Sequence, residues 1–141
     1  MKQLTGLKGV FVLVKELDPD ASKIGLTKET IQRDVELKLR MAGIQTLTQQ
    51  ERYSEPGKPF LYINLNVTNI SDSFVYNIFV ELMQKVRLVR MPGLVHTGIT
   101  WSKGSTGQVG RNKMPEQVIR NRIKHLVDAF LNDYQSVNPK K

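Results

Sequence analysis

The residues that most often carry out chemistry are few in this sequence, and they are not spaced for joint action. The chain has 141 residues and no cysteine, which excludes disulfides, thiolate metal sites and cysteine nucleophiles. Its two histidines, His96 and His125, have no second histidine or carboxylate at ligand spacing, and no serine lies in a Gly-x-Ser-x-Gly elbow. We therefore expect no catalytic set, no metal and no cofactor, and we expect the chain not to be an enzyme.

A glycine-rich segment, Gly104–Gly110, superficially resembles the phosphate loop of dinucleotide-binding proteins because its three glycines are three residues apart. Only 31 residues follow Gly110, too few for the rest of a parallel sheet. The next helix is expected to begin at Pro115, so the loop would not present its N-terminus to a phosphate. We therefore expect residues 103–113 to be a flexible connecting loop, with nucleotide binding as the less favoured alternative.

The positive charge of the chain is concentrated in its last two-fifths. The formal net charge is +8. Residues 1–84 carry 10 basic and 10 acidic side chains, whereas residues 85–141 carry 11 basic and 3 acidic ones. Such an asymmetry is typical of a site for nucleic acid, anionic lipid or an acidic protein. The alternative is a solvated surface, because the basic residues are dispersed rather than massed in blocks.

Hydrophobic periodicity and turn residues predict the element order β-α-β-β-β-β-α over residues 1–141. This pattern predicts an α+β two-layer sandwich, with a mainly antiparallel sheet of about five strands and two helices on one face. We expect a single domain with a frayed tail at residues 137–141. The expected strands are residues 9–17, 44–47, 60–68, 73–90 and 94–102. Two helices are expected. The first begins after Thr27 and ends at Gly43, and the second begins at Pro115.

The segment 73–90 is too long for one straight strand in a compact chain. Its length would be roughly 60 Å at about 3.3 Å per residue, against an expected diameter near 37 Å, from a radius of gyration of about 14 Å. We expect a bulge or bend near Gln84, or a hairpin that projects beyond the body. The next strand, 94–102, is expected to place Val95, Ile99 and Trp101 on its inner side.

Side chains of the first helix suggest both ion pairs and a contact surface. Asp34–Lys38 and Glu36–Arg40 have the spacing and order of favourable pairs along one helix. Leu37 and Met41 fall off the apolar stripe of that helix. We expect them to contact a neighbouring element, with a partner surface as the alternative.

One face of the sheet is expected to remain open, and it is the candidate binding surface. Aromatic and basic side chains interleaved on a sheet can stack bases and hold phosphates, although the dense motif of known RNA-binding sheets is absent. A solvated or protein-contacting face is the simpler interpretation. The candidate residues are Tyr62, Asn64, Phe79, Lys85, Arg87, Arg90 and His96.

Part of the chain resembles known bacterial domains. The run Lys8–Val14 with Leu17–Asp20, followed by Asp34–Ile44, is similar to uncharacterised bacterial domains. A helix ending in Leu-Arg-x-Ala-Gly-Ile, then a short strand, a Thr-x-x-Glu turn and an alternating strand, resembles small α+β domains of cell-envelope accessory proteins. Examples are the N-terminal domain of the translocation protein TolB and the curli-secretion lipoprotein domain. The resemblance covers residues 8–68, implies a non-catalytic role in the cell envelope and transfers no site residues.

We therefore expect a non-enzymatic binding or assembly module with a protein partner, acting through the open sheet face or a projecting hairpin. An exposed strand edge can also pair with a second copy to form a homodimer. A nucleic-acid-binding domain is the alternative. No stretch approaches the roughly 20 apolar residues of a membrane span. The location stays open between the cytoplasm and, with a signal peptide removed, the periplasm.

Overall fold

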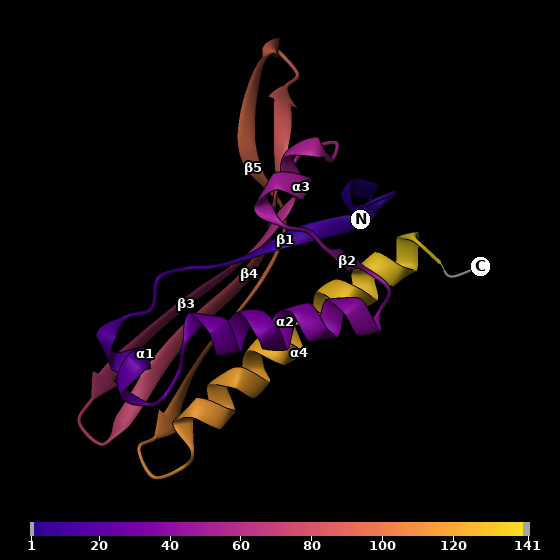
Figure 1. Cartoon of the computed structure of the whole chain (residues 1–141). Coiled ribbons are helices and arrows are strands. Elements are labelled where there is room, and N and C mark those ends of the chain that lie inside the picture. Colours follow the sequence, from indigo (N-terminus) through magenta and orange to yellow (C-terminus); the bar gives the residue numbers. More distant parts are fainter. Residues whose placement is uncertain (1, 140–141) are drawn as a thin grey trace.

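The computed structural model describes residues 2–139 and has the predicted α+β two-layer architecture. One sheet has the strand order β2-β1-β3-β4-β5, and the helices α2 and α4 lie side by side across one of its faces (Figure 1). β1 pairs in parallel with β2 and β3, whereas β3, β4 and β5 form an antiparallel meander. The strands are β1 (Gly9–Val14), β2 (Gln45–Thr46), β3 (Phe60–Ile70), β4 (Ser73–Leu88) and β5 (Met91–Gly110). The helices are η1 (Lys2–Leu4), α1 (Pro19–Lys23), α2 (Lys28–Met41), α3 (Gln49–Ser54) and α4 (Pro115–Val137).

The core lies between the sheet and the two long helices. Every second residue of β3 from Leu61 to Val67 is buried, as the alternation predicts. Trp101 of β5 packs edge-on against Phe130 of α4, with ring centroids 5.1 Å apart. The helices contribute the stripes Ile31, Val35 and Leu39 from α2, and Ile119, Ile123, Leu126, Val127 and Phe130 from α4.

The predicted boundaries of α2 are confirmed by the residues at its two ends, and α3 also has a capped start. Thr27 Oγ1 accepts a hydrogen bond from the backbone N–H of Thr30 at 3.1 Å. Gly43 follows the end of α2 with a φ of 84°, a conformation that glycine adopts without steric cost. Thr48 and Glu51 form a reciprocal capping box at the start of α3.

Ion pairs join α2 to α4. The guanidinium of Arg120 donates to both carboxylate oxygens of Asp34, at 2.9 and 3.1 Å, and these hydrogen bonds raise the pKa of Arg120. Lys38 Nζ lies 2.7 Å from Asp128 Oδ1. The predicted pair between Asp34 and Lys38 is therefore wrong, because each side chain finds its partner on the neighbouring helix.

The short helix α1 lies between the expected strand 9–17 and the helix expected after Thr27, and two acidic side chains at its start bind β3. β1 pairs with β3 only as far as Ile63, so later N–H groups on that side of β3 need other acceptors. Asp18 Oδ2 accepts from the N–H of Val67 at 3.0 Å, and Asp20 Oδ2 accepts from that of Asn69 at 2.9 Å. The two carboxylates thus replace a missing strand neighbour.

The expectation of a flexible loop over 103–113 is wrong. β5 does not end at Ser102 but continues to Gly110, and Lys103–Gly110 pairs with Ser73–Val80 of β4. A short turn after Gly110 then leads into α4. The candidate phosphate loop is therefore part of a strand.

The glycines of this segment make room for aromatic rings on β4. Gly104 is the strand partner of Phe79, and Gly107 is the partner of Tyr76. A Cβ atom on Gly104 would lie 2.5 Å from Cε1 of Phe79, and one on Gly107 would overlap the phenol of Tyr76. These glycines are thus explained by close packing in the sheet.

The expectation of a frayed tail is wrong for its first residues. Val137 completes α4. The side chain of Asn138 accepts from the N–H of Gly6 and donates to the carbonyl of Leu4, both at 2.8 Å. Residues 140–141, for which fraying was also expected, lie outside the described residues.

Candidate functional site

The β4–β5 hairpin extends beyond the rest of the sheet, as predicted from the length of segment 73–90 (Figure 1). The pairing of β3 with β4 ends at Phe60 opposite Met83, whereas β4 and β5 remain paired as far as Leu88 opposite Met91. Residues 84–99 are called the hairpin arm below. No third strand pairs with β4 over Val86–Leu88 within the described chain, and every residue from 87 to 97 is exposed.

A bulge marks the base of the arm, next to the predicted position Gln84. The register shifts between Leu82, opposite Trp101, and Met83, opposite Ile99, which leaves Thr100 as the extra residue. Gln84 Nε2 donates to Thr100 Oγ1 at 2.9 Å, and this hydroxyl lies 3.3 Å from the carbonyl oxygen of Leu82. The bulge is therefore held by side-chain hydrogen bonds and is a defined feature of the fold.

The bulge exchanges the two faces of β5 within the arm. Trp101 lies on the helix-covered face as predicted, but Ile99 and Val95 share the opposite face with Met83 and Arg87. The prediction that Val95 and Ile99 point inward is therefore wrong. His96 was expected on the open face, but it pairs with Val86 on the other face. An extra residue in a strand inverts every side chain beyond it, and the alternation of the sequence alone does not reveal this.

Exposed aliphatic side chains occupy both faces and the end of the arm. Val89 in the turn is 99% exposed, Met91 is 48% exposed and Ile99 is 55% exposed. Large exposed apolar side chains gathered on one projection are unusual for a monomer and mark contact sites. The exposed aliphatic residues of the arm are Leu88, Val89, Met91, Leu94, Val95 and Ile99.

The charges of the arm are all positive. Lys85 and Arg87 lie on the open-face side, opposite Thr97 and Val95, and Arg90 stands in the turn. Lys85 Nζ donates to Thr97 Oγ1 at 2.8 Å, and Arg87 donates to the Pro92 carbonyl at 2.8 Å. The sequence has no aspartate or glutamate between Glu81 and Glu116, so no acidic side chain of the arm itself neutralises these cations.

Three of the predicted site residues, Tyr62, Asn64 and Phe79, come together on the open face of the sheet body. Asn64 is the strand partner of Phe79, and Tyr62 is the partner of Glu81. The polar groups here bond to one another: Asn66 Nδ2 donates to Asn64 Oδ1 at 3.3 Å. Tyr62 and Asn64 are partly buried and Phe79 is 40% exposed, whereas every residue from 87 to 97 of the arm is exposed.

The helix α3 adds a cationic and aromatic corner beside the base of the arm. The guanidinium of Arg52 lies 4.5 Å from the ring centroid of Phe60 and 4.9 Å from that of Tyr53. Hydrogen bonding to Gln49 and Arg52, with the positive charge of Arg52, lowers the pKa of the Tyr53 phenol. The strand 60–68 was predicted, but the position of α3 against it was not, because it depends on tertiary packing.

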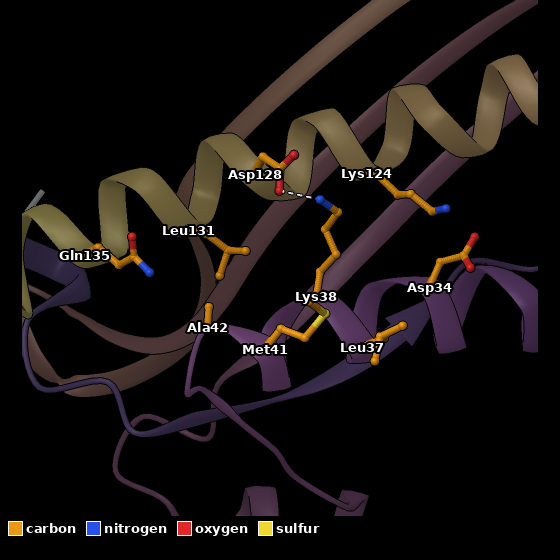
Figure 2. Close-up of a pocket in the computed structure, with 9 residues that line it drawn as sticks. All are labelled: Asp34, Leu37, Lys38, Met41, Ala42, Lys124, Asp128, Leu131 and Gln135. Atoms are coloured by element: carbon orange, nitrogen blue, oxygen red, sulfur yellow. Dashed lines mark hydrogen bonds and ion pairs between the residues drawn. The ribbon is translucent and has the colours of Figure 1, made fainter. Parts of the chain in front are cut away.

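A surface pocket of about 360 Å³ lies between α2 and α4 (Figure 2). Leu37 and Met41 border it from α2, Leu131 borders it from α4, and the Lys38–Asp128 ion pair joins the two helices there. Leu37 and Met41 are 55% and 77% exposed. The expectation that they contact a neighbouring element is therefore wrong. The pocket brings apolar and charged groups together, but it contains none of the predicted site residues.

The structure thus divides the candidate residues between two places. Tyr62, Asn64 and Phe79 lie on the sheet body, whereas Lys85, Arg87, Arg90 and His96 belong to the arm. Sequence reasoning missed the exposed aliphatic residues of the arm as binding candidates. Two features of the sequence could have indicated them. The segment is too long to be covered by the predicted elements, and it has basic residues but no aspartate or glutamate.

Fold and site together define the chain as a two-layer α+β protein with a projecting basic and apolar β-hairpin. No protein-family model matches its sequence, and no curated protein is detectably similar to it. Within residues 2–139, no helix combines the length and apolar character needed to cross a bilayer. Over the same residues, His, Asp and Glu side chains do not gather in groups that could hold a metal ion.

Proposed function

We propose that the chain is a non-enzymatic binding module and that the hairpin arm is its contact element. The observation that carries this proposal is the exposure of aliphatic side chains on both faces of the arm, with Val89 almost fully exposed at its end. Leaving such groups in water forgoes the stabilisation that burial provides, about 25 cal/mol per Å². A partner that covers these side chains recovers this stabilisation.

The open sheet face is the weaker candidate for this role. Its asparagines bond within the sheet, with Asn66 accepting from Lys15 Nζ at 2.5 Å, and Phe79 lies over Gly104. A partner at this face would have to replace hydrogen bonds that already exist, which reduces the net gain. The exposed aliphatic side chains of the arm make no hydrogen bonds, so covering them requires none to be replaced.

Nucleic acid is the second candidate partner, favoured by the acid-free sequence between Glu81 and Glu116. Neutralisation of phosphates would make the affinity fall steeply as salt rises. A role in the bacterial cell envelope, which the resemblance of residues 8–68 implies, is compatible with a binding module and belongs to the same proposal.

A shortened chain tests the proposal. Replacing residues 87–95 by Asn-Gly joins the paired residues Val86 and His96 through a dipeptide that favours tight hairpins. Both chains are compared for binding to lipid vesicles, for binding to labelled single-stranded and duplex oligonucleotides at two ionic strengths, and for self-association by light scattering.

We expect the full chain to show at least one of these interactions and the shortened chain to lose it, with an unchanged circular dichroism spectrum. Retention of every interaction by the shortened chain would contradict the assignment of the arm. The absence of all three interactions from the full chain would contradict it equally.

A further inference from the structure

We infer that the hairpin arm inserts its tip into the interface of an anionic lipid membrane. This inference rests on the proposed function, since it names the partner of the same arm. The occupant must satisfy two features at once: aliphatic side chains on both faces of a two-stranded tip, and cations on a strand pair whose own sequence has no aspartate or glutamate.

The distribution of apolar groups favours a lipid layer over a protein surface. Leu88 and Met91 lie on one face of the arm, Val95 lies on the other, and Val89 stands at the end. A rigid protein surface covers one face of a projecting hairpin, whereas a fluid lipid layer surrounds the tip and covers both. The aliphatic character of these residues also suits hydrocarbon better than the stacking on bases that aromatic side chains provide.

The cations stand at the height expected for lipid headgroups. At about 3.3 Å per residue, Arg87 is roughly 7 Å and Lys85 roughly 13 Å behind Val89. Interfacial elements bury their apolar face about 5–10 Å into the boundary between headgroups and acyl chains. Insertion of the tip to this depth brings Arg87 and Lys85 level with the lipid phosphates.

Arg90 limits how deeply the arm inserts. It stands in the turn beside Val89, so its guanidinium must reach back toward the phosphates along its own apolar stem. The strand edges of the arm also carry backbone groups that hydrocarbon cannot hydrogen-bond. Both constraints favour a position at the interface rather than a crossing of the bilayer.

Vesicle co-sedimentation with the full chain tests the inference. The probes are vesicles of phosphatidylcholine alone and of phosphatidylcholine mixed with phosphatidylglycerol, at low and physiological salt. We expect binding to the anionic vesicles, little binding to the neutral ones, and weakening by salt. Replacing Lys85 or Arg87 by Gln should weaken binding roughly fivefold each, because this is the factor in affinity that one basic side chain contributes near an anionic surface.

Val89→Asp tests the contact made by the tip of the arm. We expect it to weaken binding roughly tenfold or more, because it removes an inserted aliphatic group and adds a negative charge. Met41→Asp on α2 is the matched control: it makes the same change of charge at an exposed apolar residue outside the arm. It should lower the affinity less than Val89→Asp does.

The possible outcomes separate this inference from the proposed function. Equal loss in Val89→Asp and Met41→Asp would reduce the interaction to non-specific electrostatic adsorption and overturn insertion. Absence of vesicle binding, with oligonucleotide binding or self-association that the shortened chain loses, would overturn the lipid partner but leave the proposed function standing. Absence of any interaction that depends on the arm would overturn both.

Discussion

The strands β4 and β5 pass through two regions that differ in what covers the same alternating pattern. In the sheet body, Ile78, Val80 and Leu82 point toward α4 and are fully buried. In the arm, Val86 and Leu88 continue the alternation on the same face, but Leu88 is exposed. The comparison teaches that alternation establishes the strand and its faces, while the neighbouring elements decide whether a face becomes core or contact surface.

The largest difference between the two regions should appear when an apolar side chain is truncated. Phe130→Ala removes a fully buried ring that packs on Trp101, and it should lower the free energy of unfolding by about 3–5 kcal/mol. Val89→Ala in the arm should change it by less than about 0.5 kcal/mol. Urea denaturation measures both variants. A large loss on truncation at Val89 would show that the arm is part of the core.

Glycine substitutions sharpen the same comparison. Gly104→Ala places a methyl group against the ring of Phe79 in the body and should cost about 1–3 kcal/mol of stability. Gly93→Ala is the control in the arm, where no atom lies within 4 Å of the added Cβ. Thermal unfolding of the pair, and of Gly104→Ala combined with Phe79→Ala, gives the test. The double variant should lose no more stability than the Phe79→Ala variant alone.

The ion pairs of the body are expected to differ according to their burial. Asp34→Asn weakens the two-bonded pair with the largely covered Arg120 and should cost about 1–2 kcal/mol. Glu36→Gln affects the pair with Arg40, which is 3.9 Å long and more exposed, and should cost less than about 0.5 kcal/mol. Chemical denaturation at low and high salt compares them. Equal losses would show that the helix–helix pair adds nothing beyond an ordinary surface pair.

The smallest effect is expected at Tyr134, whose hydroxyl donates to the Leu7 carbonyl at 2.7 Å. Tyr134→Phe should cost about 0.5–1.5 kcal/mol at neutral pH. Burial raises the pKa of this phenol. Its contribution is therefore complete below the unfolded-state pKa, near 10, and is lost as the pH rises through the higher folded-state pKa. Unfolding between neutral and alkaline pH should show a steeper loss for the wild type than for Tyr134→Phe.

Much of the sheet and both long helices could be predicted because their signals are local. The alternation of 60–68, the cap at Thr27 and the stop at Gly43 each depend on neighbouring residues, and the structure confirms them. The continuation of β5 past Ser102 was missed because its glycines suggest a loop. They are accommodated by rings on another strand, Tyr76 and Phe79, and no local pattern shows that.

The candidate site was predicted only in part, for a related reason. Excess length indicated a bulge or a projecting hairpin near Gln84, and both are present. The bulge at Thr100 then reversed the faces of Val95, His96 and Ile99, because one inserted residue changes the direction of all that follow. The pairing of Asp34 with Arg120 was likewise missed, since the separation of the two helices in sequence hides their contact.

The central claim is that the arm, and not the open sheet face, makes the contact, and site-specific fluorescence tests it most directly. The chain has no cysteine, so Val89→Cys on the arm and Thr68→Cys on the exposed end of β3 each accept one environment-sensitive dye. On addition of anionic vesicles, the dye at position 89 should shift to the blue and the dye at position 68 should not. A shift at position 68 with none at position 89 would contradict the account.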